Sequence, residues 1–187
     1  MCVADAAAKE AAVARFLREH PRTAHAAGDH AALPGCADAG WSRIPGCPAG
    51  IPALLRGLLD ETAGPEALRV LGIVLMDSVL HMSAVMPAAL PYLIGLAAVP
   101  GTTVRPGLID LLVVAADLSS PLDADDEPRA LLLGDDCEHP ERERCRAAFA
   151  AHACALHALL EDETLPAGLI STDDRERLLG AVQPQRP

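Results

Sequence analysis

The sequence PAGIPALL at positions 48–55 recurs 39 residues later as PAALPYLI at positions 87–94. Both prolines, the alanine after the first proline and the three aliphatic positions are preserved in the second copy. A further match follows each copy, where positions 68, 71, 73, 74 and 77 correspond at a shift of 40 to Leu108, Leu111, Val113, Val114 and Asp117. Two linked matches at nearly one period indicate an internal repeat of about 40 residues.

Each copy of the repeat is typical of a helical hairpin. Proline is tolerated in the first turn of a helix, where its missing N–H has no intrahelical partner, so Pro48 and Pro87 mark helix starts. A second proline lies four residues after each of these. The first helices therefore either begin nearer Ile51 and Leu90 or bend at that second proline.

The turns and the second helices complete the hairpins. Residues 61–65 (ETAGP) and 99–103 (VPGTT) are rich in residues that end helices. In the second helices the polar residues occupy a narrow stripe, such as Asp110 and Asp117 on one face, and aliphatic residues cover the rest. We expect such helices to be packed between neighbouring helices.

The P-x-L-L start, the apolar partner helix and the period near 40 resemble HEAT-type (armadillo-type) helical repeats. More narrowly, residues 41–118 resemble HEAT-like proteins of actinobacteria in which a Pro-x-Leu helix follows a His-containing turn, here residues 80–83 (LHMS). The resemblance implies an all-α fold, a short HEAT-like α-solenoid of stacked antiparallel hairpins. Because members of that group often accompany toxin or secretion genes, it also implies an immunity or adaptor role.

Four segments follow from this interpretation. They are an N-terminal helix and loop over 1–40, two HEAT-like repeats over 41–118, an acidic insertion over 119–139, and a third, degenerate repeat over 140–187. High-propensity residues predict a helix over 5–19. A proline start and an alanine-rich run predict the longest helix of the chain over 140–160, and acids at its positive end place a last helix over about 172–182.

The insertion is the most distinctive departure from the repeat. Insertions in helical repeats map to loops on one face, and that face often binds. The acids of this insertion are therefore candidate partner-binding residues: Asp123, Asp125, Asp126, Glu127, Asp135, Asp136 and Glu138. The alternative is a solvated loop that keeps an otherwise apolar protein soluble.

Charge and hydropathy exclude two classes of partner. A formal net charge of −11 argues against a nucleic-acid backbone, whose binding needs lysine and arginine. Residues 82–99 are apolar and about long enough to span a membrane. However, Pro87 and Pro91 lie inside this stretch and no basic cluster flanks it, so we expect a buried helix instead.

The first residues and the cysteines indicate a cytoplasmic protein. Asp5 stands where a secretory leader needs basic residues, and no apolar core follows it. The six cysteines form no C-x-x-C pair, so we expect them to be reduced thiols.

A search for chemistry predicts no catalytic, cofactor-binding or metal-binding residues. The sequence has no G-x-S-x-G, phosphate loop or H-E-x-x-H motif. Cys145, His152, Cys154 and His157 share one predicted helix, but Cys145 and Cys154 fall on opposite faces and cannot close one metal site.

The sequence thus favours a non-catalytic protein-binding module, an immunity-type or adaptor protein that binds a basic protein partner and uses no cofactor. Two other classes stay open. One is a structural or regulatory protein that self-associates through apolar terminal repeats, and the other is an enzyme or metal-binding helical protein. The oligomeric state is not indicated by the sequence.

Overall fold

The computed structural model of the chain describes residues 5–25, 30–122, 127–166 and 168–183. Within these residues the chain forms helices and no β-strand, which confirms the all-α prediction. The α-helices are α1 Ala6–Glu19, α2 Pro21–His25, α3 Ile51–Gly57, α4 Gly64–Leu75, α5 Met86–Ala97, α6 Arg105–Ser119, α7 Glu127–Leu133, α8 Pro140–Ala151, α9 Ala153–Leu160 and α10 Thr172–Ala181. Two short 3₁₀ helices, Cys36–Asp38 and Trp41–Arg43, lie between α2 and α3.

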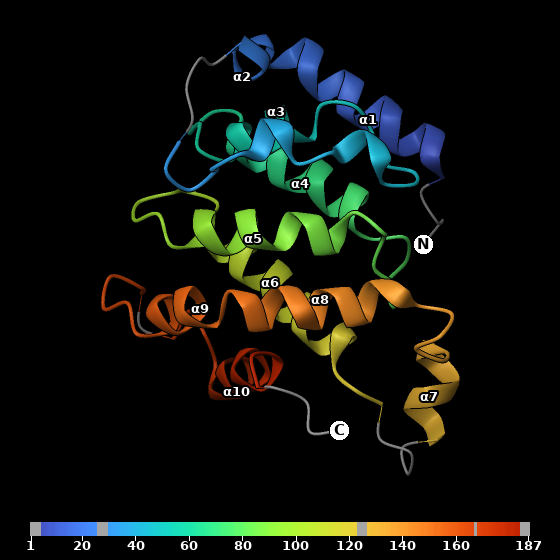
Figure 1. Ribbon diagram of the computed structural model, residues 1–187. Coiled ribbons are helices and arrows are strands. Elements are labelled where there is room, and N and C mark those ends of the chain that lie inside the picture. Colours follow the sequence, from blue (N-terminus) through green and yellow to red (C-terminus); the bar gives the residue numbers. More distant parts are fainter. Residues whose placement is uncertain (1–4, 26–29, 123–126, 167, 184–187) are drawn as a thin grey trace.

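The helices form layers that follow one another in chain order (Figure 1). At the N-terminal end, α1 packs on α3 and α4, and α3 packs on α4. In the middle, α5 packs on α6, and α6 also touches α4. At the C-terminal end, α8 packs on α5 and α6, while α10 packs on α6.

In the two copies of the repeated sequence, the first helix begins at different positions relative to the two prolines. Helix α3 begins at Ile51, because Gly50 adopts a positive φ of 98° that ends the preceding turn. In the second copy Ala89 replaces this glycine, and α5 begins earlier, at Met86. Pro91 therefore lies inside α5, whereas the corresponding proline of the first copy lies in the first turn of α3.

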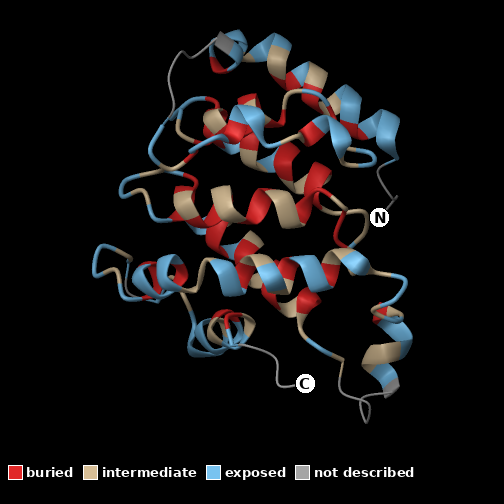
Figure 2. Cartoon of the chain, in the orientation of Figure 1, coloured by how far each residue is buried: buried red, intermediate tan, exposed pale blue. Residues whose placement is uncertain are grey.

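The second helices are buried on most sides, as their sequence predicts (Figure 2). In α6, Leu108, Leu112 and Ala115 are fully buried. The stripe that begins with Asp110 faces solvent. No helix in the described part of the chain is both long enough and apolar enough to cross a membrane.

Equivalent ends of the two second helices are capped by cations from outside the repeats. Lys9 of α1, which is buried, donates to Val74 O at 3.0 Å and pairs with Asp77 after α4. Arg129 of α7 donates to Asp117 O at 2.8 Å. A cation at a helix C-terminus satisfies unpaired carbonyls and opposes the helix dipole, so these contacts fix α1 and α7 to the repeats.

Arg105 joins the middle layer to the C-terminal layer. It opens α6 and is buried, and its guanidinium donates to Ala97 O at 2.7 Å and to Thr164 Oγ1 at 3.0 Å. It also pairs with Asp162, in the connection between α9 and α10. The residues that meet here are 57 positions apart in the chain.

The Arg105–Asp162 pair predicts a specific acid sensitivity. Hydrogen bonds from Arg105 and then Thr164 lower the pKa of Asp162 from 3.8 to about 2. A carboxyl whose pKa is lower in the folded state stabilises that state at pH values above its unfolded pKa, and the contribution is lost as the pH falls through about 2. We expect Asp162→Asn to reduce the pH dependence of the free energy of unfolding between about pH 4 and pH 2, as measured by urea titration.

The predicted long helix over 140–160 is wrong, because the chain breaks at His152. There φ is −112° and ψ is 20°, and the ring Nδ1 lies 3.0 Å from Ala148 O. The N–H of His152 still donates to Ala148 O and Phe149 O, both at 3.1 Å, and α9 begins at Ala153, directly after this one residue. The longest helix of the described residues is instead α6, with 15 residues.

Close backbone contact at Gly95 predicts that this glycine cannot be enlarged. A Cβ atom added there would lie 2.9 Å from Ala32 O, a backbone atom that cannot turn aside. We expect Gly95→Ala to lower the free energy of unfolding by about 1–2 kcal/mol, despite the higher helix propensity of alanine. Gly72→Ala is the matched control: a Cβ at this position in α4 meets nothing within 4 Å, so it should be neutral or stabilising by up to about 1 kcal/mol.

The five cysteines of the described residues form no disulfide, and their exposure differs. Burial raises the pKa of Cys145 to about 12, whereas Cys137 and Cys154 are exposed. Because the thiolate is the reactive form, we expect a disulfide reagent to modify Cys137 and Cys154 in the folded protein and Cys145 only after unfolding. Peptide mapping by mass spectrometry checks this, and rapid labelling of Cys145 in the native state would contradict the buried position.

Candidate protein-binding surface

The acidic insertion contains a helix and is not simply a loop. Helix α6 continues to Ser119, and α7 occupies Glu127–Leu133. The candidate residues Asp123, Asp125 and Asp126 lie outside the described residues, as does the side chain of Glu127. In Figure 1, α7 lies beside the stacked helices rather than within them.

The three remaining candidate acids divide into two kinds. Asp135 and Glu138 are exposed. Asp136 instead accepts hydrogen bonds from Arg142 at 3.1 Å and Arg146 at 2.8 Å. Burial alone would raise the pKa of Asp136, but the hydrogen bonds from these arginines outweigh it and hold the pKa below its usual value. Asp136 therefore fastens the insertion to α8, and the structure does not gather all the candidate acids on one surface.

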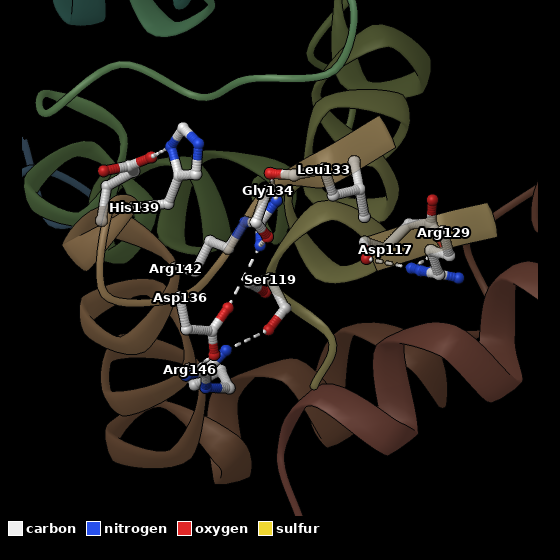
Figure 3. Close-up of polar contacts among 10 residues, drawn as sticks. Asp117, Ser119, Arg129, Leu133, Gly134, Asp136, His139, Arg142 and Arg146 are labelled. Atoms are coloured by element: carbon white, nitrogen blue, oxygen red, sulfur yellow. Dashed lines mark hydrogen bonds and ion pairs between the residues drawn. The ribbon is translucent and has the colours of Figure 1, made fainter. Parts of the chain in front are cut away.

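Arg142 is the main anchor of the insertion (Figure 3). Its side chain is 3% exposed. It donates to the carbonyl oxygens of Leu133 and Gly134, the latter at 3.1 Å, in addition to Asp136. Because three acceptors converge on one buried guanidinium, the C-terminal end of α7 is fixed to the first turn of α8.

Arg146 fastens the opposite end of the insertion. It donates to Ser119 O at 2.9 Å, at the end of α6, and to Asp136. Composition alone gives neither arginine this supporting role, because the basic residues of an exposed helix are usually solvated. A signal was present: Arg142 and Arg146 are four residues apart and so lie on one face of α8, toward the acids that precede it.

The anchored helix displays two leucines to solvent. Leu131 is 86% exposed and Leu132 is 62% exposed, whereas Leu133 is buried. Gly134 ends α7 with a φ of 68°, and its N–H donates to Ala130 O at 2.9 Å. A glycine in the left-handed region after the last turn is a common helix C-cap, so the turn that carries the leucines has a defined end.

A pair of histidines supports the junction between the insertion and α8. The rings of His81 and His139 are 4.7 Å apart between centroids. His139 Nδ1 lies 3.0 Å from a carboxylate oxygen of Glu141, and His81 Nδ1 lies 2.9 Å from Ser78 Oγ. The loop before α5 thus contacts the start of α8, close to the anchor of α7.

A groove of about 740 Å³ lies between α6, α8 and α10. Small residues form most of its wall, and its polar lining includes Ser119, Ser120, Glu143 and Arg146. Both serine hydroxyls lie within hydrogen-bonding distance of Ala116 O, and Arg146 is committed to Ser119 O and Asp136. Among the described residues, neither serine of this lining is hydrogen-bonded to the side chain of a base.

The residues considered as metal ligands are not brought together. Cys145 is buried, whereas Cys154 and His157 are exposed on α9. Over the described ranges, no three His, Cys, Asp or Glu side chains are placed to hold one metal ion. Comparison of the chain with protein-family models, with curated proteins and with solved structures found no match.

Proposed function

We propose that this chain is a non-catalytic protein-binding module, a short HEAT-like solenoid whose partner is a basic protein. The observation that carries the proposal is α7 with its acidic C-terminal loop, which two largely buried arginines of α8 fasten beside the stacked helices. Because these arginines hold the segment in one position, its recognition by another molecule would carry a low ordering cost. Immunity-type or adaptor proteins are the class that this reading favours.

The order of helix contacts supports a solenoid. Helices α8 and α10 stack on α5 and α6, as expected if residues 140–187 form a third unit after the two over 41–118. Helix α1, from the N-terminal segment, then covers the first repeat through α3 and α4. Solenoids recognise proteins through extended surfaces built by equivalent helices.

The charge of the chain supports a basic partner. The formal net charge is −11, and exposed acids occur on α6 (Asp110) and after α7 (Asp135 and Glu138). Complementary charge accelerates association and suppresses incorrect partners. A secreted, nuclease-like toxin, which must itself be basic to bind nucleic acid, is the kind of target that such a surface would neutralise.

The proposal is tested by affinity capture from the source cell. The bait is the wild-type chain and a variant with Asp123→Asn, Asp125→Asn, Asp126→Asn and Glu127→Gln. The control, Asp38→Asn, Glu61→Gln, Glu163→Gln and Glu176→Gln, changes the net charge equally at exposed sites on other segments. We expect one basic partner that the first variant loses and the control retains. Capture of no basic partner by the wild-type chain would overturn the proposal, and equal capture by all three baits would exclude residues 123–127 from the binding surface.

Self-association is the second candidate: the route expected from the sequence is through the terminal helices of the stack, while the two exposed leucines lie on α7, beside the stack. The terminal helices do not support it, because their outer faces are polar. In α1 these faces carry Glu10, Arg15 and Arg18, and in α10 they carry Asp173 and Glu176, all of them exposed. Polar outer faces are typical of capping units. Light scattering that shows a concentration-dependent dimer would support self-association, and a monomer at all concentrations would exclude it.

A further inference from the structure

The exposed leucines of α7 are unusual for this molecule. Only four large apolar side chains of the described residues are substantially exposed: Val79, Val114, Leu131 and Leu132. Two of the four are consecutive residues in the last turn of one helix. Single exposed apolar residues need no explanation, whereas two in one helical turn form a small apolar patch whose burial by another molecule would be favourable.

The helix that carries these leucines is held in place mainly at its ends and by one side chain. A seven-residue helix is too short to be stable by itself. Here Gly134 caps its C-terminus, Leu133 is buried, Arg142 binds its last carbonyl and Arg129 reaches Asp117 O. The leucine pair is therefore displayed in a fixed conformation before any partner arrives, which lowers the ordering cost of binding.

The charges around the pair indicate what covers it. Asp135 and Glu138, both exposed, follow the leucines within seven residues, and Asp136 between them is neutralised by the arginines of α8. A second copy of the chain would bring its own Asp135 and Glu138 against these acids, in a molecule of net charge −11. Like charges oppose that contact, and the same acids attract a lysine or arginine.

We propose that α7 is the anchor by which the protein binds its partner: Leu131 and Leu132 enter an apolar strip on a protein surface, and lysine or arginine side chains beside the strip pair with Asp135 and Glu138. This deepens the proposed function and rests on it. The apolar pair supplies the affinity, and the charges set the orientation and the association rate.

The test uses the full chain and a synthetic amphipathic helical peptide of leucine and lysine, with a leucine and glutamate peptide of the same pattern as its control. Fluorescence anisotropy gives the dissociation constants. We expect the lysine peptide to bind the wild-type chain. The double substitution Leu131→Ser and Leu132→Ser should raise the dissociation constant by about tenfold or more. We expect Asp135→Asn with Glu138→Gln to weaken binding several-fold and to reduce its salt dependence. The control Val79→Ser, at a residue that is 61% exposed in the loop after α4, should bind as the wild type does.

A second readout does not depend on the folding of any variant. Cys137 is exposed and lies between the leucines and Glu138, whereas Cys154 is exposed on α9. The bound lysine peptide should slow chemical modification of Cys137 and leave that of Cys154 unchanged. Equal protection of both thiols, or of neither, would overturn the assignment of the site.

The remaining outcomes separate the alternatives. Equal binding of the glutamate peptide, or binding of the chain to phosphatidylcholine vesicles that the leucine variant loses, would show a merely apolar surface and overturn the proposal. A dimer that the leucine variant abolishes would identify a second copy as the occupant. In the last outcome, a cellular partner is lost when residues 123–127 are neutralised but still binds the leucine variant. That result would leave the proposed function standing and overturn only the proposed binding role of α7.

Discussion

Arg142→Ala should lower the free energy of unfolding by about 3 kcal/mol, because removing one member of a buried charged network leaves the others unpaired. The carbonyls of Leu133 and Gly134 and one oxygen of Asp136 all lose their donor. Loss of this contact should also release α7, so limited proteolysis should cut the 119–139 segment faster than in the wild type. Urea unfolding and a protease time course measure the two effects.

Arg144→Ala is the control for Arg142, because Arg144 is exposed on the same helix and should change stability by no more than about 0.5 kcal/mol. Arg142→Lys separates charge from geometry. A single ammonium cannot reproduce the fork of a guanidinium, so the lysine variant should recover only part of the loss. Equal stability of Arg142→Ala and Arg144→Ala would contradict the role of Arg142 in holding α7 against α8.

Arg105→Ala should have an effect of similar size, about 3 kcal/mol, through a different part of the molecule. The buried Ala97 O loses its donor, and the connection between α9 and α10 loses its tie to α6. The variant should also lose the acid sensitivity that Asp162 confers, since the pKa of Asp162 is lowered chiefly by Arg105. Urea titrations at neutral and acidic pH measure both effects.

The exposed pair Arg69–Glu66 provides the comparison for Arg105. Its members are joined by two hydrogen bonds of 2.7 Å on the surface of α4. Solvent weakens such pairs, so Arg69→Ala should cost no more than about 0.5 kcal/mol. A loss in Arg105→Ala as small as this would show that the buried arginine does not join the two layers.

The sequence predicted most of the local helical structure, but few of the long-range contacts that join the helices. Residues 5–19 read as a helix and form α1 over Ala6–Glu19, since alanine-rich propensity and Pro21 act within a few residues. The side-chain partners of Arg105 are 57 and 59 positions away, and contacts so distant leave no periodic pattern in a single sequence. The break at His152 escaped prediction because no proline or glycine marks it in the sequence.

The sequence singles out the insertion but does not distinguish among its acids. The insertion over 119–139 stands out because it interrupts the repeat. Composition alone treats its acids as equivalent, whereas the fold turns Asp136 inward and leaves Asp135 and Glu138 exposed. The leucines of α7 look like core residues in the sequence, and only their position beside the stack shows that two of the three face solvent.

The capped C-terminal ends of α4 and α6 limit how this architecture can be lengthened by adding further units. Asp77 and Asp117 occupy equivalent positions, but Lys9 and Arg129, which reach these two helix ends, come from segments that are not repeated. Duplicating one 40-residue unit would copy the aspartate and the open helix terminus without supplying another cation. Lengthening the protein by tandem duplication would therefore require a compensating basic residue, unlike arrays of identical units, which extend freely.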